Sequence, residues 1–416
     1  MAEMIELKEQ EERVILVAVS TGEDDDTAAS VDELEELAST AGAVTVGKVI
    51  QNRENVHPGT YLGKGKIEEV KELLWELDAT GIICDDELSP AQLKNLEDAL
   101  DTKVKDRTMV ILDIFASRAR TREGKIQVEL AQLRYRAVRL VGLRNSLSRL
   151  GGGIGTRGPG EKKLEVDRRL IHERISQLKS ELEDVKRHRE VVRKKRENGG
   201  ALTAAIVGYT NAGKSTLLNR LTQAGILAED KLFATLDPTT RALTLPGGER
   251  VLLTDTVGFI RKLPHHLIEA FKSTLEEAKY SDVILHVVDC SNPQMDMQMH
   301  VVYETLRQLE ITDKEIVTVF NKIDREGADT AGRDMAADYR VKISAKTGEG
   351  LPDLLGVLET ILRSRRIYFE KVFSYAEAGR IQRIRKNGRL LSEEYKEDGI
   401  HVTAYVPVEL FEELYR

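Results

Sequence analysis

The chain has 416 residues, more than one ordinary hydrophobic core supports, so we expect two or three domains. Apolar residues make up 41% and charged residues 32%, which is typical of a soluble, charge-rich globular protein. The two cysteines, Cys84 and Cys290, favour reduced thiols over a disulfide framework. The acidic N-terminus lacks a signal-peptide pattern, so we expect a cytoplasmic protein with no membrane insertion.

The net charge of −8 hides a strongly basic segment. Between Arg118 and Arg196 there are 23 Lys and Arg residues against 10 Asp and Glu residues, a local net charge of +13. The rest of the chain therefore carries −21. A basic segment within an acidic protein indicates a polyanionic partner for that segment, and the alternative is a solvated helical face.

Strands and helices are predicted to alternate over residues 1–116. Ser30 and Glu33 form a capping-box pattern, which predicts that the first helix opens there, and Ser89-Pro90 predicts the start of the third helix. The apolar run Met109–Phe115 leaves its own state open. The expected strands are 14–20, 43–51 and 81–85, and the second helix is expected at 66–77. This alternation predicts an N-terminal parallel-sheet α/β domain.

Residues 117–200 are predicted to form a basic helical hairpin. Apolar residues recur at helical spacing from Ile126 to Val141, and again from Leu164 to Val185. The segment 151–160, G-G-G-I-G-T-R-G-P-G, cannot form regular structure and separates the two helices.

Residues 201–363 contain a phosphate-binding pattern. An apolar strand, 202–207, leads into G-Y-T-N-A-G-K-S, and a helix follows, which is the P-loop context. Lys214 is expected to bridge the β- and γ-phosphates, and the Ser215 hydroxyl is expected to bind Mg²⁺. The predicted contacts of this loop are Gly208, Tyr209, Thr210, Asn211, Ala212, Gly213, Lys214, Ser215 and Thr216.

Three further motifs each follow a predicted strand. Asp255, in D-T-V-G, can hold Mg²⁺ through a water, and the Gly258 N–H can meet the γ-phosphate. Asp324, in N-K-I-D, can accept hydrogen bonds from guanine N1–H and the 2-amino group, and adenine offers neither donor. S-A-K supplies a backbone N–H for guanine O6. The predicted contacts are Asp255, Thr256, Val257, Gly258, Asn321, Lys322, Ile323, Asp324, Ser344, Ala345 and Lys346.

These four motifs occur in a fixed order at the carboxyl ends of strands, where open α/β sheets bind ligands. Each motif alone fits a solvated loop, but the series predicts a P-loop domain that binds guanine nucleotide, GTP or GDP. The segment 233–241, F-A-T-L-D-P-T-T-R, resembles a switch I loop, in which one threonine reaches Mg²⁺ and the γ-phosphate. We select Thr235, with Thr239 as the competitor that the sequence does not exclude. The predicted nucleotide contacts here are Phe233, Ala234, Thr235, Leu236 and Asp237, and the predicted metal ligands are Ser215, Thr235 and Asp255.

Residues 364–416 are predicted to form a small C-terminal α/β module. Strands are expected at 368–374, 390–395 and 400–406, with a helix at 377–386 and a short terminal helix. The predicted fold class is therefore α/β throughout, with the helical hairpin as the exception.

The motifs together resemble the HflX family of bacterial translation-associated GTPases, in the Obg–HflX branch of P-loop GTPases. The resemblance extends to G-G-I-G-T-R-G-P-G-E at 152–161 and to P-G-T-Y-L-G-K-G-K at 58–66. Residues 162–165 are K-K-L-E, where the family usually has T-Q-L-E, so no special role is expected of that Thr and Gln.

The resemblance implies a GTPase that binds the large (50S) ribosomal subunit, contacts its ribosomal RNA and helps to split stalled ribosomes. The residues expected to touch RNA are Arg144, Arg149, Arg157, Lys162 and Lys163. A monomer is the default expectation. The alternative function is a nucleotide-dependent binding switch for a non-ribosomal protein partner.

For GTP hydrolysis, we assign catalytic roles to Lys214, Thr235, Gly258 and Asn211. Phe259 follows D-T-V-G and cannot orient a water, which predicts slow turnover until a partner remodels the switch loops. Asn211 holds the fourth position of the phosphate loop, where resembling GTPases use an asparagine to seat a potassium ion, K⁺. An exposed loop amide is the other interpretation, and both stay open.

Overall fold

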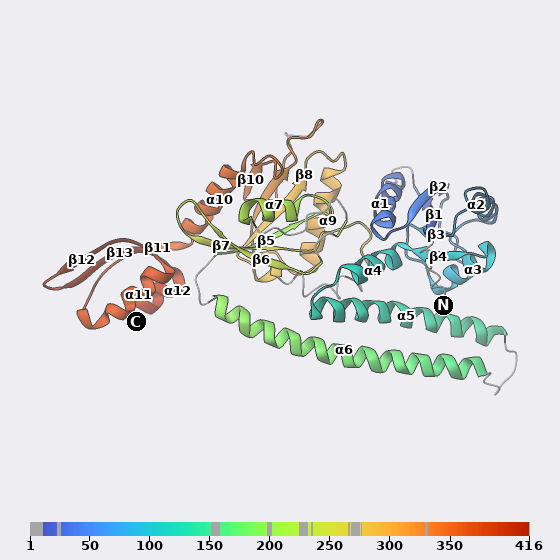
Figure 1. Ribbon diagram of the computed structural model, residues 1–416, viewed down its shortest axis with the longest axis horizontal. Coiled ribbons are helices and arrows are strands. Elements are labelled where there is room, and N and C mark those ends of the chain that lie inside the picture. The colour runs from blue at the N-terminus through green and yellow to red at the C-terminus, as the bar shows by residue number, and fades with distance from the viewer. Residues whose placement is uncertain are drawn as a thin grey trace, which may run out of the picture. The chain divides into compact units, whose positions relative to one another are not determined.

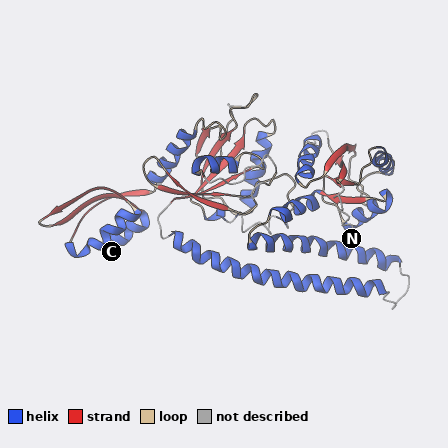
Figure 2. Ribbon diagram, viewed as in Figure 1, coloured by secondary structure: helices blue, strands red, loops and turns tan. Residues whose placement is uncertain are grey.

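The computed structural model describes residues 11–22, 26–150, 159–197, 202–223, 232–233, 236–264, 267, 275, 277–328 and 332–415. Side chains are left out for residues 141–150, 159–164, 188, 190–197, 387 and 408–409. The chain divides into two compact units. Unit 1 comprises Met1–Glu183, Glu229–Asp237 and Ile260–Ser273, and unit 2 comprises Asp184–Ala228, Pro238–Phe259 and Thr274–Arg416. Both units contain a sheet with helices, which confirms the α/β class (Figure 2), whereas the four-domain division stays a prediction.

Unit 1 contains a four-stranded parallel sheet in the order β2-β1-β3-β4 (Figure 1). The strands are β1 (Arg13–Ser20), β2 (Val44–Asn52), β3 (Gly81–Cys84) and β4 (Lys103–Asp106), and the connecting helices are α1 (Thr27–Thr40), α2 (Lys64–Glu76) and α3 (Pro90–Leu100). The chain leaves β1 for β2 on one side and then returns to β3 on the other side. The carboxyl ends of β1 and β3 therefore border the point at which the strand order reverses.

The start of α1 differs from the prediction. The helix begins at Thr27, so the capping box expected from Ser30 and Glu33 is wrong. Ser30 lies within the helix, and its hydroxyl donates to Asp85 Oδ2 at 2.8 Å. The Ser89 cap is confirmed, because its side chain accepts from Gln92 N and forms a capping box at the start of α3.

The run Met109–Phe115 proves to be helical and belongs to α4 (Arg107–Arg118). The Asp106 side chain caps this helix by accepting from Met109 N at 2.9 Å. Strand β4 was not predicted, because K-V-K-D is too short to show an apolar periodicity.

Two long helices follow, α5 (Arg122–Leu150) and α6 (Pro159–Glu197). They run side by side (Figure 1), and Arg174 of α6 donates to both carboxylate oxygens of Glu129 of α5 at 2.8 and 3.0 Å. Residues 119–121 separate α4 from α5, close to the predicted start of the helical hairpin at residue 117. The irregular segment predicted at 151–160 is wrong at its end, because Pro159 and Gly160 form the start of α6, and residues 151–158, including Arg157, lie outside the described residues.

Unit 2 contains a six-stranded sheet in the order β10-β9-β8-β5-β7-β6, in which only the β6–β7 pair is antiparallel. The strands are β5 (Leu202–Gly208), β6 (Thr239–Thr244), β7 (Arg250–Asp255), β8 (Val283–Asp289), β9 (Glu315–Asn321) and β10 (Tyr339–Lys342). The helices include α7 (Lys214–Thr222), α9 (Met295–Gln308) and α10 (Leu351–Ser364). Every residue of β8 is buried, as expected for a strand covered on both faces.

The C-terminal part of unit 2 forms a separate antiparallel sheet in the order β11-β13-β12. Its elements are β11 (Arg366–Phe373), the 3₁₀ turn η1 (Tyr375–Glu377), α11 (Ala378–Asn387), β12 (Arg389–Lys396), β13 (Gly399–Pro407) and α12 (Val408–Tyr415). Alternate residues of β13 are buried against apolar side chains of α11 and α12, including Ile384 and Leu414. Two helices on one face of the sheet therefore build the core of this module.

A buried ion network holds the carboxyl ends of the unit 1 strands together. Arg107 is 1% exposed, and its guanidinium pairs with Asp85 at 2.7 Å and with Glu33 at 2.6 Å. Lys262, from the part of unit 1 that follows D-T-V-G, pairs with the other oxygen of Asp85 at 2.5 Å. Burial raises the pKa of Asp85, but attraction to Arg107 and Lys262 outweighs it, so the pKa lies below its usual value. The negative charge of the buried Asp85 carboxylate is therefore stabilised by Arg107 and Lys262.

We expect Arg107→Met to destabilise unit 1 by about 3–5 kcal/mol, because it leaves the Asp85 carboxylate buried without its principal counterion. The measurement is denaturant unfolding of the full chain. Lys48→Met is the control, since Lys48 pairs with exposed Asp32 and Glu35, and its loss is expected to cost about 0–1 kcal/mol. Equal effects of the two substitutions would contradict the structural role of Arg107.

Candidate functional site

The phosphate-loop motif lies between β5 and the first turn of α7. Gly208 has φ 153° and Gly213 has φ 97°, conformations that L side chains rarely adopt. A side chain at Gly208 would collide with the Val287 carbonyl, and one at Gly213 would collide with the Asn321 amide. Both positions therefore require glycine, and the loop ends at the N-terminus of α7. Backbone N–H groups at a helix N-terminus can bind a phosphate.

Lys214 is buried beneath this loop, at 6% exposure. Its ammonium donates to the carbonyls of Tyr209 at 2.7 Å and Gly208 at 3.2 Å. Burial lowers the pKa of Lys214 to about 8, with Asp255 opposing the shift and Lys322 adding to it. An arriving polyanion would favour the charged form, so nucleotide binding and protonation of Lys214 are linked.

Two of the predicted metal ligands lie together. Ser215 Oγ donates to Asp255 Oδ2 at 2.7 Å, and Asp255 is buried at the end of β7. Hydroxyl and carboxylate oxygens are hard ligands that suit Mg²⁺. Thr235 and Ala234 lie outside the described residues, and Thr239 is paired with Asp255 across the β6–β7 ladder. The choice between the two threonines stays open.

The D-T-V-G segment runs beside the phosphate loop. Thr210 N donates to the Phe259 carbonyl at 2.7 Å, and Phe259 N donates to the Gly208 carbonyl at 3.1 Å. A Cβ at Gly258 would lie 2.9 Å from Lys214 Nζ, so this approach requires glycine. Phe259 is 1% exposed, which fits the expectation that it plays no part in orienting water.

The base-recognition motifs are joined through buried Asn321. Its amide donates to the Ala212 carbonyl at 2.8 Å, and its side-chain oxygen accepts from Ala345 N at 2.9 Å. Asn321 therefore connects the phosphate loop to the S-A-K loop. Asp324 is exposed, and a hydrogen bond from the Ser344 side chain holds its pKa below the usual value. The Asp324 carboxylate is thus ionised and available as an acceptor.

Sequence reasoning missed Asp289, at the end of β8. Its carboxylate pairs with Lys322 Nζ at 2.6 Å and fixes the lysine of N-K-I-D. The available signal was an acidic residue at the carboxyl end of a buried strand, V-V-D, the position that also carries Asp255. The remaining members of the motifs, Thr256, Val257, Ile323 and Lys346, lie within these loops, and their nucleotide contacts stay predictions.

Phe233, Leu236 and Asp237 of the switch I-type segment belong to unit 1, whereas residues 238–241 belong to unit 2. Phe233 packs edge-on against Phe115, with ring centroids 4.7 Å apart, and Leu236 is buried. The Asp237 carboxylate accepts hydrogen bonds from the backbone N–H groups of Arg120 and Thr121, both at 2.9 Å. In the structure these side chains contact other residues of unit 1. The nucleotide contacts predicted for Phe233, Leu236 and Asp237 stay predictions.

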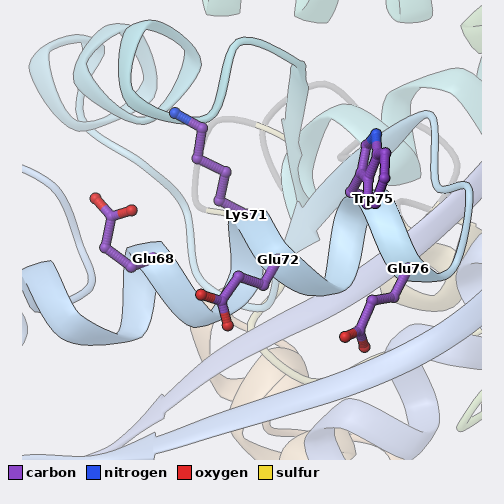
Figure 3. Close-up of a pocket in the computed structure, with 5 residues that line it drawn as sticks. All are labelled: Glu68, Lys71, Glu72, Trp75 and Glu76. Atoms are coloured by element: carbon purple, nitrogen blue, oxygen red, sulfur yellow. The ribbon is translucent and has the colours of Figure 1, made fainter.

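A separate hollow on α2 is lined by Glu68, Lys71, Glu72, Trp75 and Glu76 (Figure 3). Its three carboxylates would repel a phosphate, so it does not compete with the phosphate loop as a nucleotide site. Asn211 is half-buried in a left-handed conformation, φ 58°, which fits either of its two interpretations. In the part of the chain that the structure describes, no helix is both long and apolar enough to cross a membrane.

We expect the affinity for GDP to fall as pH rises through the Lys214 pKa of about 8. Between pH 7 and 8.5 the expected loss is about fourfold, because only the charged ammonium attracts the phosphates. Equilibrium titration measures this change. Lys214→Arg is the matched control, since a guanidinium stays charged across this range. A wild-type affinity that falls no more than that of the Arg variant would exclude Lys214 as the titrating group.

Asp324→Ala is expected to weaken GDP binding by roughly 100-fold, because two hydrogen bonds to a charged acceptor are lost. Competition with ATP should then approach that of GDP, since the discriminating group is gone. The exposed carboxylate Asp313 precedes β9, and Asp313→Ala serves as the control with unchanged binding. Retained preference for GDP in the Asp324 variant would contradict its role in base selection.

Three family models match the chain in succession. "GTP-binding GTPase N-terminal" matches residues 28–116, and "GTP-binding GTPase Middle Region" matches residues 118–196. "50S ribosome-binding GTPase" matches residues 203–322, the part that contains the phosphate loop, D-T-V-G and Asn321.

Curated relatives match the chain over its full length. A "GTPase HflX" from Lacrimispora saccharolytica is 77% identical over 414 residues, covering 100% of this chain and 98% of the relative. A "GTPase HflX" from Caldanaerobacter subterraneus is 50% identical and covers 99% of this chain and 95% of the relative. A solved GTP-binding protein from Sulfolobus solfataricus, in complex with GDP, is 24% identical with a TM-score of 0.46, covering 84% and 98%. On the evidence of these sequence matches and of the nucleotide motifs, the chain belongs to the HflX family of GTPases.

Proposed function

We propose that this GTPase associates with the 50S ribosomal subunit and acts in ribosome splitting, recycling or biogenesis. The observation that carries the proposal is the +13 charge of residues 118–196, which comprise α5 and all of α6 except its last residue. The match of residues 203–322 to a "50S ribosome-binding GTPase" supports the same partner. Ribosomal RNA is the polyanion that these helices would contact.

The described side chains of α5 and α6 provide cations that are open to solvent. Lys125, Arg136, Arg168 and Lys179 are all exposed. Such residues can neutralise backbone phosphates and release counterions, which makes binding strongly dependent on salt. We propose further RNA contacts at the carboxyl end of α5 and the amino end of α6. These are Arg144, Arg149, Lys162 and Lys163.

The nucleotide site would then act as the switch that controls this association. Ser215 and Asp255, with Thr235 from the switch I-type segment, would hold Mg²⁺, which neutralises charge on the β- and γ-phosphates when bound. Lys214 would place its ammonium on the same phosphates, and the Gly258 N–H would hold the γ-phosphate. Asn211 is the residue that would seat K⁺. The residue that follows Gly258 is Phe259, which cannot orient a water, so we propose slow hydrolysis by the free protein and stimulation by the ribosomal partner.

The test is co-sedimentation of the full chain with purified 50S subunits under GDP, a non-hydrolysable GTP analogue and no nucleotide. We expect more protein in the pellet with the analogue than with GDP, and we expect added salt to release it. Phosphate release should accelerate when 50S subunits are added. Absence of both effects would favour a switch for a non-ribosomal protein partner.

Reversing charges on α5 and α6 tests whether these helices form the contact with ribosomal RNA. Arg149→Glu, Lys162→Glu and Lys163→Glu in one protein are expected to lower 50S binding at least tenfold while GTP affinity holds, because phosphate contacts dominate such affinity. The matched control reverses three exposed cations of unit 2, Arg250, Lys342 and Lys396. Unchanged 50S binding by the first variant, or an equal loss of binding in both variants, would refute a contact through α5 and α6.

A further inference from the structure

The lysine of N-K-I-D has a backbone conformation that depends on its surroundings. Lys322 has φ 67°, in the left-handed region that residues other than glycine rarely adopt. Its ammonium donates to Asp289 Oδ2 at 2.6 Å, and the side chains of Lys322 and Asp289 are only 13% and 11% exposed. Solvent screens a pair with so little exposure only weakly. The pair therefore restricts the Lys322 side chain to one orientation.

The Asp289 carboxylate is itself held on its other side. Its second oxygen, Oδ1, accepts hydrogen bonds from the backbone N–H of Ser291 at 3.0 Å and from the Ser291 hydroxyl at 2.6 Å. Both carboxylate oxygens thus have fixed partners, and such charge-assisted hydrogen bonds are strong. Asp289 meets the lysine from a fixed turn at the end of β8.

The same turn also holds the asparagine of N-K-I-D. Asp289 is paired with Asn321 across the β8–β9 ladder. The Asn321 carbonyl accepts from the backbone N–H of Cys290 at 3.1 Å and from its Sγ at 2.8 Å. Residues 289 and 290 therefore contact the first two residues of N-K-I-D, although they belong to none of the four nucleotide motifs.

We propose that Asp289 is a positioning residue for guanine recognition, which acts through Lys322 on the Asp324 carboxylate. The ion pair stabilises the left-handed conformation of Lys322, and this conformation directs the chain towards Asp324, two residues later. Without the pair, the backbone of Lys322 relaxes and the Asp324 carboxylate is displaced. Hydrogen bonds weaken steeply when they are misaligned, so the loss falls on the contacts with the base. The proposal uses the role in base selection predicted for Asp324 and is independent of ribosome association.

The test compares the affinities of the full chain for GDP and for inosine diphosphate, which lacks the 2-amino group. The ratio of the two affinities measures the hydrogen bond from that group. Wild-type protein is expected to prefer GDP by about tenfold or more, as one hydrogen bond to a charged acceptor provides. In Asp289→Asn the preference is expected to fall about fivefold, because a neutral amide does not hold the Lys322 ammonium. A preference within about twofold of the wild-type value would overturn the proposal.

A double-mutant cycle tests whether Asp289 acts through Lys322. Lys322→Met removes the ammonium and keeps a side chain of similar length. In the Lys322→Met background, Asp289→Asn is expected to lower the GDP affinity by less than about twofold further, because its partner is already absent. If the losses of the two single variants instead multiply in the double variant, Asp289 does not act through the lysine and the proposal is overturned.

Asp334→Asn is the matched control. Asp334 is buried in the same unit and accepts hydrogen bonds from Thr318 of β9, the strand that leads into N-K-I-D, and from Tyr303. Its loss is expected to lower the thermal stability and to leave the preference for GDP unchanged. An equal fall of the preference in Asp334→Asn and Asp289→Asn would assign the effect to general packing and overturn the proposal.

If Asp289→Asn fails to fold, Ser291→Ala decides the question. This variant keeps the ion pair and removes the hydroxyl that holds the Asp289 carboxylate, so the preference for GDP is expected to fall about two- to threefold. An unchanged preference in Ser291→Ala would then overturn the proposal.

Asp324→Ala in the same assay separates the positioning residue from the base acceptor. Loss of the preference in Asp324→Ala, together with an unchanged preference in Asp289→Asn, would reject Asp289 and retain Asp324. A retained preference in Asp324→Ala would remove the acceptor on which Asp289 acts and overturn the proposal. The assay contains no ribosomes, so its result is distinct from the test of 50S association.

Discussion

Close approach of backbone around the buried Lys214 is the constraint on which the nucleotide site depends. Gly208 meets the Val287 carbonyl, Gly213 meets Asn321, and Gly258 lies next to the lysine ammonium itself. Each of these close contacts excludes a side chain at the glycine. The groups that remain at the end of β5 are backbone N–H groups and the Lys214 ammonium. The same burial lowers the Lys214 pKa to about 8, so a phosphate is the partner that best restores its charge.

The motifs for phosphate and base are joined by side-chain hydrogen bonds and an ion pair. Asn321 bonds to both the phosphate loop and Ala345, and Asp289 holds Lys322 from the neighbouring strand. Because β5, β8 and β9 are adjacent and parallel, these loops emerge at the same edge of the sheet. A change in one loop therefore reaches the others through two buried hydrogen bonds and one ion pair.

Unit 1 uses charge in a different way. Arg107 and Asp85 form a pair with almost no exposure, and Lys262 joins it from the segment after D-T-V-G. Asp237 accepts hydrogen bonds from the backbone N–H groups of Arg120 and Thr121, directly before α5. Both segments that flank nucleotide motifs in the sequence thus end in ionic or charge-assisted contacts within unit 1. Because a buried polar group costs free energy when it loses its partner, these contacts constrain both segments to one geometry within unit 1.

The sequence by itself determined the chemistry of the nucleotide site, because the phosphate loop is eight contiguous residues whose roles follow from local geometry. It also determined most strands and helices of the fold, since their apolar periodicity is local. The tertiary structure alone decided which polar residues pair. Ser30 looked like a helix cap but bonds to Asp85, 55 residues away, and the Asp237 carboxylate accepts a hydrogen bond from Thr121 N, 116 residues before it. A short-range pattern carries no information about such partners, because a hydroxyl or carboxylate takes whichever donor or acceptor the packed backbone brings within 3 Å.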